Sequence, residues 1–288
     1  MKSIIQTGYN QANLQDIPTS LFSPISVKIK TKLVPLLRYD LLKLSGEVPT
    51  QIPSILGYGA LGTVIDVGTL RSTNLINQRV ICLNPWGTFQ EEIISNIPPL
   101  VIPIIEKISD EEAVGLIGGA DLALTLFKIV KNINKPIIIY GADSVTGLVL
   151  MQLLTQHTNS MFVPKVRSRS QNYLDQKIEE YHIRAVSNLS QQDHLVIDLV
   201  GNAIQNELTK HLQNREEIIS VAQKDIPGIK FISRPSFPKD YQFLMNEIAN
   251  KRLFIPINHT FHYTQFQEAL TYQKTNPSRG RNLISFEN

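Results

Sequence analysis

The chain has 288 residues, which is enough for one large domain or for two ordinary domains with ample core. Its hydrophobic fraction of 42% and charged fraction of 18% are typical of a folded globular protein and exclude a disordered one. A formal charge of +3, from 28 basic and 25 acidic residues, is too small to indicate a nucleic-acid binder, so we expect no nucleic-acid partner.

Cysteine content and hydropathy exclude further classes of protein. The single cysteine, Cys82, excludes an internal disulfide and a cysteine-rich zinc site. The first residues, MKSIIQTGYNQ, contain no long apolar run, and no stretch approaches 18 consecutive apolar residues. We therefore expect a cytoplasmic protein with no membrane partner.

The first 115 residues favour β-structure. Short β-branched runs are broken there by Pro and Gly, namely SVKIKTKLV, GTVIDVG, QRVICL and FQEEIIS. Only RYDLLKLSG (38–46) has a helical pattern. The sequence predicts a mostly β unit with tight turns.

From about residue 116 the pattern alternates between strands and helices. The predicted strands are KPIIIY, MFVPKV, RAVS, HLVIDLVG, EEIISVA and IKFISR, and the predicted helices are VTGLVLMQLLTQH, QNYLDQKIEEYH, NAIQNELTKHLQN and DYQFLMNEIANKR. Continuously apolar strands alternating with helices predict a doubly wound parallel sheet, a Rossmann domain. The last residues return to strand, helix and strand. The predicted α/β fold therefore has a Rossmann dinucleotide-binding domain (116–253) inserted in a β-rich domain (1–115 plus 254–288).

The stretch YGADSVTGLVLMQLL (140–154) is where the first of these strands turns into a helix. Such a turn offers free backbone N–H groups and a helix dipole, which together bind anions. Ala142, Ser144 and Gly147 stand where a dinucleotide fingerprint usually has glycines. A plain strand–helix turn is equally compatible with this pattern. The predicted cofactor-binding residues of the loop are Gly141, Ala142, Asp143, Ser144, Val145 and Thr146.

The end of the second strand decides which dinucleotide is expected. An NAD site has an Asp or Glu about 20 residues after the loop, to bind the ribose 2′-hydroxyl. Here the position falls on VRSRSQNY, with Arg167 and Arg169 and no acid at the strand end. Guanidinium groups bind a 2′-phosphate, Ser168 could donate a hydroxyl, and Tyr173 could flank the adenine. The alternative is a solvated basic turn. Together with the loop, the cluster favours NADP(H) over NAD(H).

An ordered set of segments resembles the medium-chain dehydrogenase/reductase superfamily over nearly the whole chain. The segments are PSILGYGALGTVIDVG, QRVICLNPWGTFQEEII, ISDEEAVGLIGGADLALTLF, IIIYGADSVTG, VIDLVG and FQEALTYQKTNPSRGRNLISF. The pattern is most similar to the zinc-free quinone oxidoreductases and the mitochondrial-type 2-enoyl thioester reductases. The resemblance implies a GroES-like catalytic domain split around a Rossmann domain.

Zinc-dependent relatives carry a cysteine near the end of an early strand and a Gly-His-Glu motif after it. Here VPLLRYDLL has no cysteine, and GYGALG has Tyr58 and Gly59 where His and Glu would stand. The resemblance therefore implies an enzyme without catalytic zinc, and we expect no metal.

The resemblance also implies site residues. It places Tyr39 and Asp40 at the substrate cleft as catalytic candidates, Asp121 and Thr125 beside the nicotinamide, Val200 and Gly201 in the loop after VIDLVG, and Arg281 near a cofactor phosphate. Each has a structural alternative: Tyr39 as a packed aromatic, Asp121 as a first-turn charge of a helix, and Arg281 in a solvated turn.

Two departures from the family pattern concern the chemistry. Leu37 and Arg38 replace an Asn–Pro pair that usually precedes Asp40. The enoyl reductases have a proton-donating tyrosine in the following loop, but KLSGEVPTQ contains none. Tyr39 lies near enough to be the candidate substitute.

The expected function is that of an NADPH-dependent, zinc-independent oxidoreductase that transfers hydride to a small-molecule acceptor, a quinone or an activated C=C. The alternative is an NADPH-binding sensor of the same fold that has lost turnover, and an RNA-binding role has only the modest positive charge in its favour. Relatives dimerise through edge strands of their nucleotide domains, so IKFISR (229–234) implies a homodimer.

Overall fold

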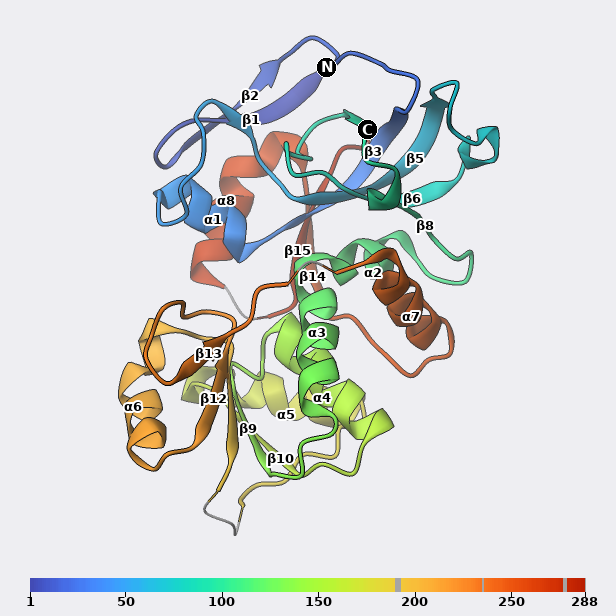
Figure 1. Ribbon diagram of the computed structural model, residues 1–288. Helices are drawn as coiled ribbons and strands as arrows, with labels where there is room; N and C mark the ends of the chain where they lie inside the picture. The colour runs from blue at the N-terminus through green and yellow to red at the C-terminus, as the bar shows by residue number, and fades with distance from the viewer. Residues whose placement is uncertain (190–192, 235, 277–278, 288) are drawn as a thin grey trace.

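The computed structural model describes residues 1–189, 193–234, 236–276 and 279–287. Figure 1 shows a β-rich unit that carries both ends of the chain and, below it, an α/β unit. The chain passes between the units near α2 and α3 and returns near β14. The exact boundaries proposed above for two domains stay a prediction.

The β-rich unit is built from both ends of the chain. Within the described residues its larger sheet has the order β14-β15-β3-β5-β6-β8, with β7 paired to β3, and a smaller sheet has the order β2-β1-β4. Its elements are β1 (Lys2–Gly8), β2 (Gln11–Asp16), β3 (Val27–Leu36), α1 (Arg38–Ser45), β4 (Ser54–Ile55), β5 (Gly59–Val67), β6 (Arg79–Leu83), β7 (Glu92–Ser95), β8 (Val101–Pro103), β14 (Ile257–His262), α8 (Phe266–Thr275) and β15 (Arg281–Ser285). The predicted runs in residues 26–95 form strands, whereas the N-terminal hairpin β1–β2 was not predicted.

The α/β unit has a parallel sheet with the order β10-β9-β11-β12-β13 among the described residues. Its elements are α2 (Asp110–Gly115), a distorted turn (Leu116–Ala120), α3 (Asp121–Val130), β9 (Ile137–Tyr140), α4 (Val145–His157), β10 (Phe162–Lys165), α5 (Gln171–Glu180), β11 (Leu195–Asp198), α6 (Gln205–Gln213), β12 (Glu217–Ser220), β13 (Ile229–Phe231) and α7 (Pro238–Ala249). The strand order reverses between β9 and β11, so the switch point lies at their carboxyl ends. Ligands of doubly wound sheets bind at this point.

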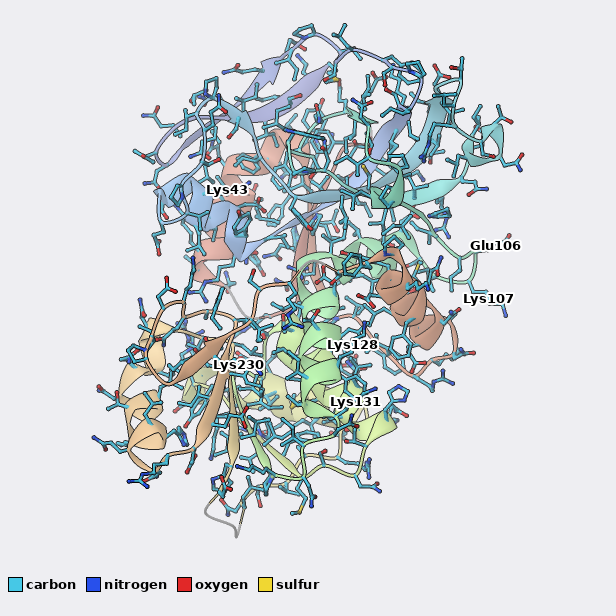
Figure 2. All side chains as sticks on the ribbon, viewed as in Figure 1. Lys43, Glu106, Lys107, Lys128, Lys131 and Lys230 are labelled. Atoms are coloured by element: carbon cyan, nitrogen blue, oxygen red, sulfur yellow. The ribbon has the colours of Figure 1, made fainter. Side chains whose placement is uncertain are left out.

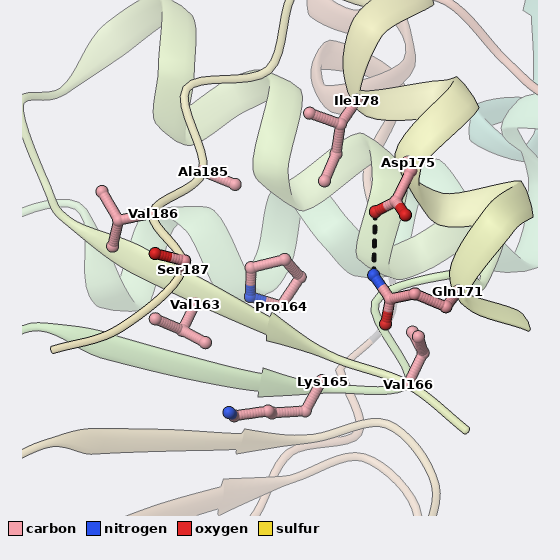
Figure 3. Close-up of a pocket in the computed structure, with 10 residues that line it drawn as sticks. All are labelled: Val163, Pro164, Lys165, Val166, Gln171, Asp175, Ile178, Ala185, Val186 and Ser187. Atoms are coloured by element: carbon pink, nitrogen blue, oxygen red, sulfur yellow. Dashed lines mark hydrogen bonds between the residues drawn. The ribbon is translucent and has the colours of Figure 1, made fainter. Parts of the chain in front are cut away.

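The prediction of a strand at residues 184–187 is wrong. Only one hydrogen bond, from Val186 N to Phe162 O at 3.0 Å, joins this segment to β10. Pro164 lies two residues further along the same edge of β10 and has no N–H to donate, so a longer ladder cannot form there. In its place, β10, α5 and residues 185–187 line a pocket of about 370 Å³ (Figure 3).

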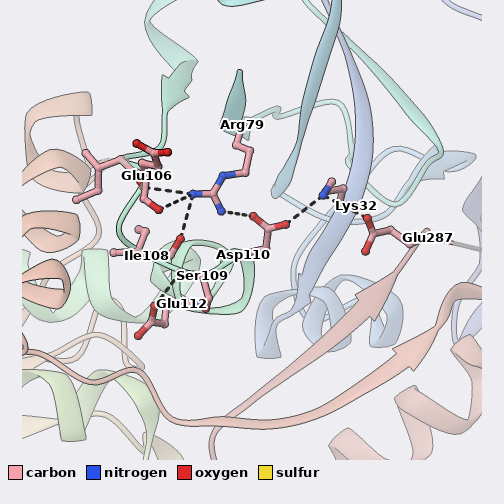
Figure 4. A network of polar contacts seen from close by, with 9 residues as sticks. Lys32, Arg79, Glu106, Ile108, Ser109, Asp110, Glu112 and Glu287 are labelled. Atoms are coloured by element: carbon pink, nitrogen blue, oxygen red, sulfur yellow. Dashed lines mark hydrogen bonds and ion pairs between the residues drawn. The ribbon is translucent and has the colours of Figure 1, made fainter. Parts of the chain in front are cut away.

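A polar network fixes the start of α2 against the β-rich unit (Figure 4). Arg79 donates to Asp110 at 2.7 Å, and Lys32 pairs with both Asp110 and Glu287 at 3.3 Å. Ser109 and Glu112 form a capping box at the same helix end. These contacts tie α2 to β3, β6 and the C-terminal residues, so the helical segment that leads into the α/β unit starts from a fixed point.

The stretch Asp110–Val130 is long and apolar enough to cross a membrane by composition, with a mean hydropathy of 1.8. However, 72% of this window is buried inside the protein, as in a core helix. The stretch is also not one straight helix, because Ile117 (ψ 128°) and Gly118 (φ 66°) break it. The break lies where the chain passes from one unit to the other.

Candidate functional site

The loop between β9 and α4 forms the tight turn that the sequence predicts. Ser144 caps α4 by accepting from Gly147 N at 3.0 Å. A Cβ at Gly147 would meet main-chain atoms of Ala142 at 2.7–2.8 Å, so only glycine lets the helix begin this close to the loop. The first N–H groups of α4 have no acceptor within the helix, which makes this end an anion site.

Arg281 is buried beside this helix end, not in a solvated turn. Its side chain is 7% exposed, and a Cβ at Gly119 would overlap both Nη2 of Arg281 and the side chain of Val145, the first residue of α4. Nε and Nη2 are buried and have no hydrogen-bond partner among the described residues. Burial lowers the pKa of Arg281 to about 10, although Asp121 and Asp40 act in the opposite direction. A guanidinium in this condition needs an anionic or polar partner from outside the chain.

Asp121 lies in the first turn of α3, and its carboxylate is fully bonded within the protein. Oδ1 accepts from Gly119 N at 2.9 Å and Leu122 N at 2.7 Å, and Oδ2 accepts from the Tyr241 hydroxyl of α7 at 2.8 Å. Burial raises the pKa of Asp121. The hydroxyl of Thr125 donates to the Asp121 carbonyl oxygen one turn earlier. The structure therefore gives Thr125 a bond within α3 and Asp121 bonds that tie α3 to the preceding turn and to α7, and their contact with a nicotinamide stays a prediction.

The segment Leu37–Asp40 opens α1. Asp40 is 0% exposed and accepts from Leu37 N at 2.8 Å and from Gly57 N at 3.2 Å. Burial raises its pKa to about 6. Such an enclosed carboxylate orients the start of α1, so the predicted role at the substrate cleft remains a prediction.

Tyr39, in contrast, is 42% exposed, and the Lys43 ammonium group lies 4.9 Å from its ring centroid. Figure 2 shows Lys43 on α1, which faces the α/β unit. Tyr58, which stands where zinc-dependent relatives have histidine, is partly buried, and the field of Asp121 and of Tyr39 adds to burial in raising its pKa. Tyr58 thus feels the charge of groups from two other segments, Tyr39 of α1 and Asp121 of α3.

The loop after β11 is held by a residue whose role was not predicted. Asp198 is 0% exposed, and its Oδ1 accepts from Val200 N and Gly201 N, both at 2.8 Å. Its Oδ2 accepts from the Ser220 hydroxyl at 2.7 Å, which ties β11 to β12. An Asp at the end of an apolar strand and three residues before a Gly was the available signal. Asp198 thereby fixes Val200 and Gly201, the predicted cofactor loop, at the switch point.

The basic residues at the end of β10 lie as predicted around a short turn. Arg167, Ser168 and Arg169 are exposed, and no carboxylate in the described part of the chain lies within ion-pair distance of either arginine. Beneath the turn, Asp143 is 4% exposed and Oδ2 of Asp143 and the Tyr173 hydroxyl are buried without a hydrogen-bond partner. Burial raises the pKa of both groups, and the charges of Arg167 and Arg169 oppose this at Asp143.

Several of the predicted residues thus lie in two groups. One contains Arg281 and the start of α4, where burial lowers the pKa of Arg281 and the charges of Asp40 and Asp121 oppose this shift. The other contains Asp143, Tyr173, Arg167 and Arg169. Among the residues that the structure describes, no three His, Cys, Asp or Glu side chains are placed to hold a metal ion.

Neither a protein-family model nor a curated protein matches this sequence. Solved structures do match its fold. The quinone oxidoreductase from Coxiella burnetii has a TM-score of 0.85 at 20% identity and covers 100% of this chain and 99% of its own. A Bacillus thuringiensis protein assigned as an NADPH:quinone reductase has a TM-score of 0.82 at 17% identity, with 99% of both chains covered. A short chain alcohol dehydrogenase from E. coli CFT073, solved with NADH, has a TM-score of 0.80 at 17% identity, with the same coverage.

These likenesses confirm the predicted fold class, a Rossmann-type parallel sheet combined with a β-rich GroES-like unit. At 17–20% identity they establish the fold alone.

Proposed function

We propose that the protein is an NADP(H)-dependent oxidoreductase that works without zinc and reduces a quinone or an activated C=C. The single observation that carries the proposal is Arg281, a buried guanidinium with two unbonded nitrogens beside the N-terminal turn of α4. Guanidinium groups and helix N-termini both bind phosphate, and here they lie together at the switch point of a doubly wound sheet.

The residues present fit a dinucleotide at both of its ends. Arg281 and the loop 141–146 would hold the pyrophosphate, while Val200 and Gly201 line the switch point on the β11 side. Arg167 and Arg169, exposed and without ion-pair partners in the described chain, would bind a 2′-phosphate, which supports NADP(H) over NAD(H). The likeness to an NADPH:quinone reductase and to an NADH-bound dehydrogenase supports a nicotinamide cofactor.

When bound, the cofactor supplies the hydride, so the protein has to orient the reactants and exclude water. The helix kink at residues 117–120, stabilised by the bonds of Asp121, sets the wall against which Arg281 packs. Tyr39 and Tyr58 are the phenols near this wall, and Tyr39, which is more exposed, remains the proposed proton donor to the reduced acceptor.

Independence of zinc is supported by the donor set. Tyr58 and Gly59 occupy the positions of the metal-binding motif, and the only cysteine, Cys82, is buried in β6. Burial raises the pKa of this thiol to about 12, which disfavours the thiolate that binds metal.

The second candidate is a binding protein of the same fold that holds NADPH without turnover. It is favoured by the enclosure of Asp40, because this predicted catalytic group is fully bonded to backbone N–H groups. We further propose a cytoplasmic homodimer whose subunits join at the edge strand β13.

Calorimetric titration with NADPH and NADH, followed by NADPH-oxidation assays, tests the proposal. We expect NADPH to bind more tightly than NADH and to be consumed with 9,10-phenanthrenequinone or a 2-enoyl thioester. Binding without consumption over a broad acceptor panel would support the second candidate. Absence of binding would contradict both.

A further inference from the structure

Two buried polar atoms at the end of β10 have no partner in the protein. One is Oδ2 of Asp143, in the loop between β9 and α4, and the other is the hydroxyl of Tyr173, in the first turn of α5. Asp143 is 4% exposed, so bulk solvent does not reach its carboxylate. An unbonded buried polar group destabilises a fold, and more so when it is charged. Two such groups close together indicate a missing partner.

The two atoms belong to one local environment. Asp143 is among the charges that raise the pKa of Tyr173, yet the two side chains form no hydrogen bond with each other. Arg167 and Arg169, from the turn after β10, favour the ionised form of Asp143. Arg279 acts on Tyr173 from the turn that precedes β15. The group therefore combines one acceptor, one hydroxyl and three surrounding guanidinium groups.

This combination suits the ribose of an adenosine nucleotide. A carboxylate oxygen accepts from a sugar hydroxyl, a phenol can donate to or accept from the same hydroxyl, and guanidinium groups bind a neighbouring phosphate. The acid that binds the ribose in an NAD site follows the second strand, but this chain has arginines there. Asp143 supplies a carboxylate to the same region from the loop of the first strand.

Resting on the proposed nucleotide-binding function, we propose that Asp143 Oδ2 and the Tyr173 hydroxyl bind the ribose 3′-hydroxyl of the adenosine half, independently of the 2′-phosphate. Tyr173 is half-buried and Asp143 is 4% exposed, so binding requires a local movement that opens the carboxylate to the ribose. Asp143 and Tyr173 then contribute to the affinity for both nucleotides, and Arg167 and Arg169 to the preference between them.

The sharpest variants are Tyr173→Phe and Asp143→Asn, which change one or two atoms and keep the shape of the side chain. Because each removes an unbonded polar or charged group, we expect the ligand-free protein to become more stable, with a melting temperature raised by about 2–4 °C. Tyr181→Phe in the same helix region and Asp175→Asn in α5 are matched controls, since Tyr181 stacks on Phe254 and Asp175 is exposed.

The probes are adenosine 2′,5′-bisphosphate and its 3′-deoxy analogue, titrated calorimetrically into the full-length protein. We expect Tyr173→Phe to weaken binding of the parent bisphosphate about fivefold and Asp143→Asn about tenfold or more. The 3′-deoxy analogue should bind the wild type about tenfold more weakly, and the two variants should bind it no worse than the wild type does. NADPH and NADH should lose affinity by the same factor in each variant.

The inference is overturned if the variants gain stability but bind the parent bisphosphate as the wild type does, because an internal water would then be the missing partner. Equal affinity of the wild type for the parent and the 3′-deoxy analogue overturns it as well. If the wild type binds neither the bisphosphate nor NADPH, the proposed function itself fails, and this result is distinct from the other two.

Discussion

Arg38 donates from Nη1 to the carbonyl oxygen of Val200 at 3.3 Å, which joins the start of α1 to the loop after β11 across 162 positions of sequence. Val200 is also fixed through its N–H by Asp198. The β-rich unit thus contacts the α/β unit directly at the switch point. Arg38 is one of the two residues that replace the Asn–Pro pair of the family pattern.

Because this bond joins the two units beside the predicted cofactor loop, Arg38→Met should speed release of NADPH. A partly exposed, charge-assisted hydrogen bond contributes about 1 kcal/mol, so we expect a dissociation rate about fivefold higher, measured by stopped-flow fluorescence. Arg38→Lys keeps the charge, so its dissociation rate should lie between those of the wild type and Arg38→Met. A release rate in Arg38→Met equal to that of the wild type would contradict such a role of the bond.

Tyr241→Phe should destabilise the fold through Asp121. Tyr241 is 0% exposed, and its hydroxyl is the only bond to Oδ2 of Asp121 among the described residues. Removing this hydroxyl leaves a buried carboxylate oxygen unbonded, so we expect the free energy of unfolding to fall by about 1–3 kcal/mol in urea titrations. Tyr263→Phe, whose ring stacks on Phe286, is the control and should change it little. A similar loss in the control would point to ring packing instead.

The fold was predictable because it depends on local patterns. The helix at 145–157 was predicted with the bounds that α4 has, since its capping Ser144 and apolar spacing are local signals. The failed strand at 184–187 depended on a partner, and Pro164 in that partner removes the donor. β1 and β2 form an antiparallel hairpin, but its turn at Tyr9 and Asn10 lacks the Asn-Gly or Asp-Gly pair that indicates one, and β4, which pairs with β1, has just two residues.

The site was predictable in its parts but not in its burial. The family resemblance placed Arg281 near a cofactor, and the loop pattern placed Asp143 there, but neither could indicate that both side chains are enclosed and carry unbonded polar atoms. The bonds of Asp121 to Tyr241, 120 positions away, and of Asp198 to Ser220 connect separate elements. A single sequence carries no signal for such pairs before the fold is known.

Arg281→Met should separate binding from stability. The substitution removes a buried guanidinium with two unbonded nitrogens and keeps a side chain of similar length, so the ligand-free protein should be at least as stable in urea titrations. Loss of the phosphate contact should weaken NADPH at least tenfold by calorimetry. Arg281→Lys keeps the charge and should recover part of the affinity. A stable Arg281→Met protein with unchanged affinity would exclude the phosphate contact.

Arg167→Glu should weaken NADPH selectively. A carboxylate at this exposed position would repel a 2′-phosphate and leave a 2′-hydroxyl unaffected or favoured, so we expect NADPH affinity to fall at least tenfold while that of NADH changes less than threefold. Arg215→Glu is the control, because this residue precedes β12 at the opposite end of the sheet. Equal losses for the two nucleotides would remove the case for 2′-phosphate recognition.

Asp40 should make the fold less stable as the pH rises. Its folded-state pKa of about 6 lies above the ordinary value of 3.8, because the carboxyl is buried. The folded state therefore holds this proton more tightly than the unfolded state does, and the resulting stability is fully present below about pH 4 and lost as the pH rises through 6. The two pKa values correspond to a loss on the order of 3 kcal/mol by pH 7. In Asp40→Asn this component is absent, so urea unfolding at several pH values should give a wild-type-minus-variant difference that falls between pH 4 and 7. Asp175→Asn, an exposed control, should leave the wild-type profile unchanged, and a difference for Asp40→Asn that is constant over this range would show that Asp40 does not titrate there.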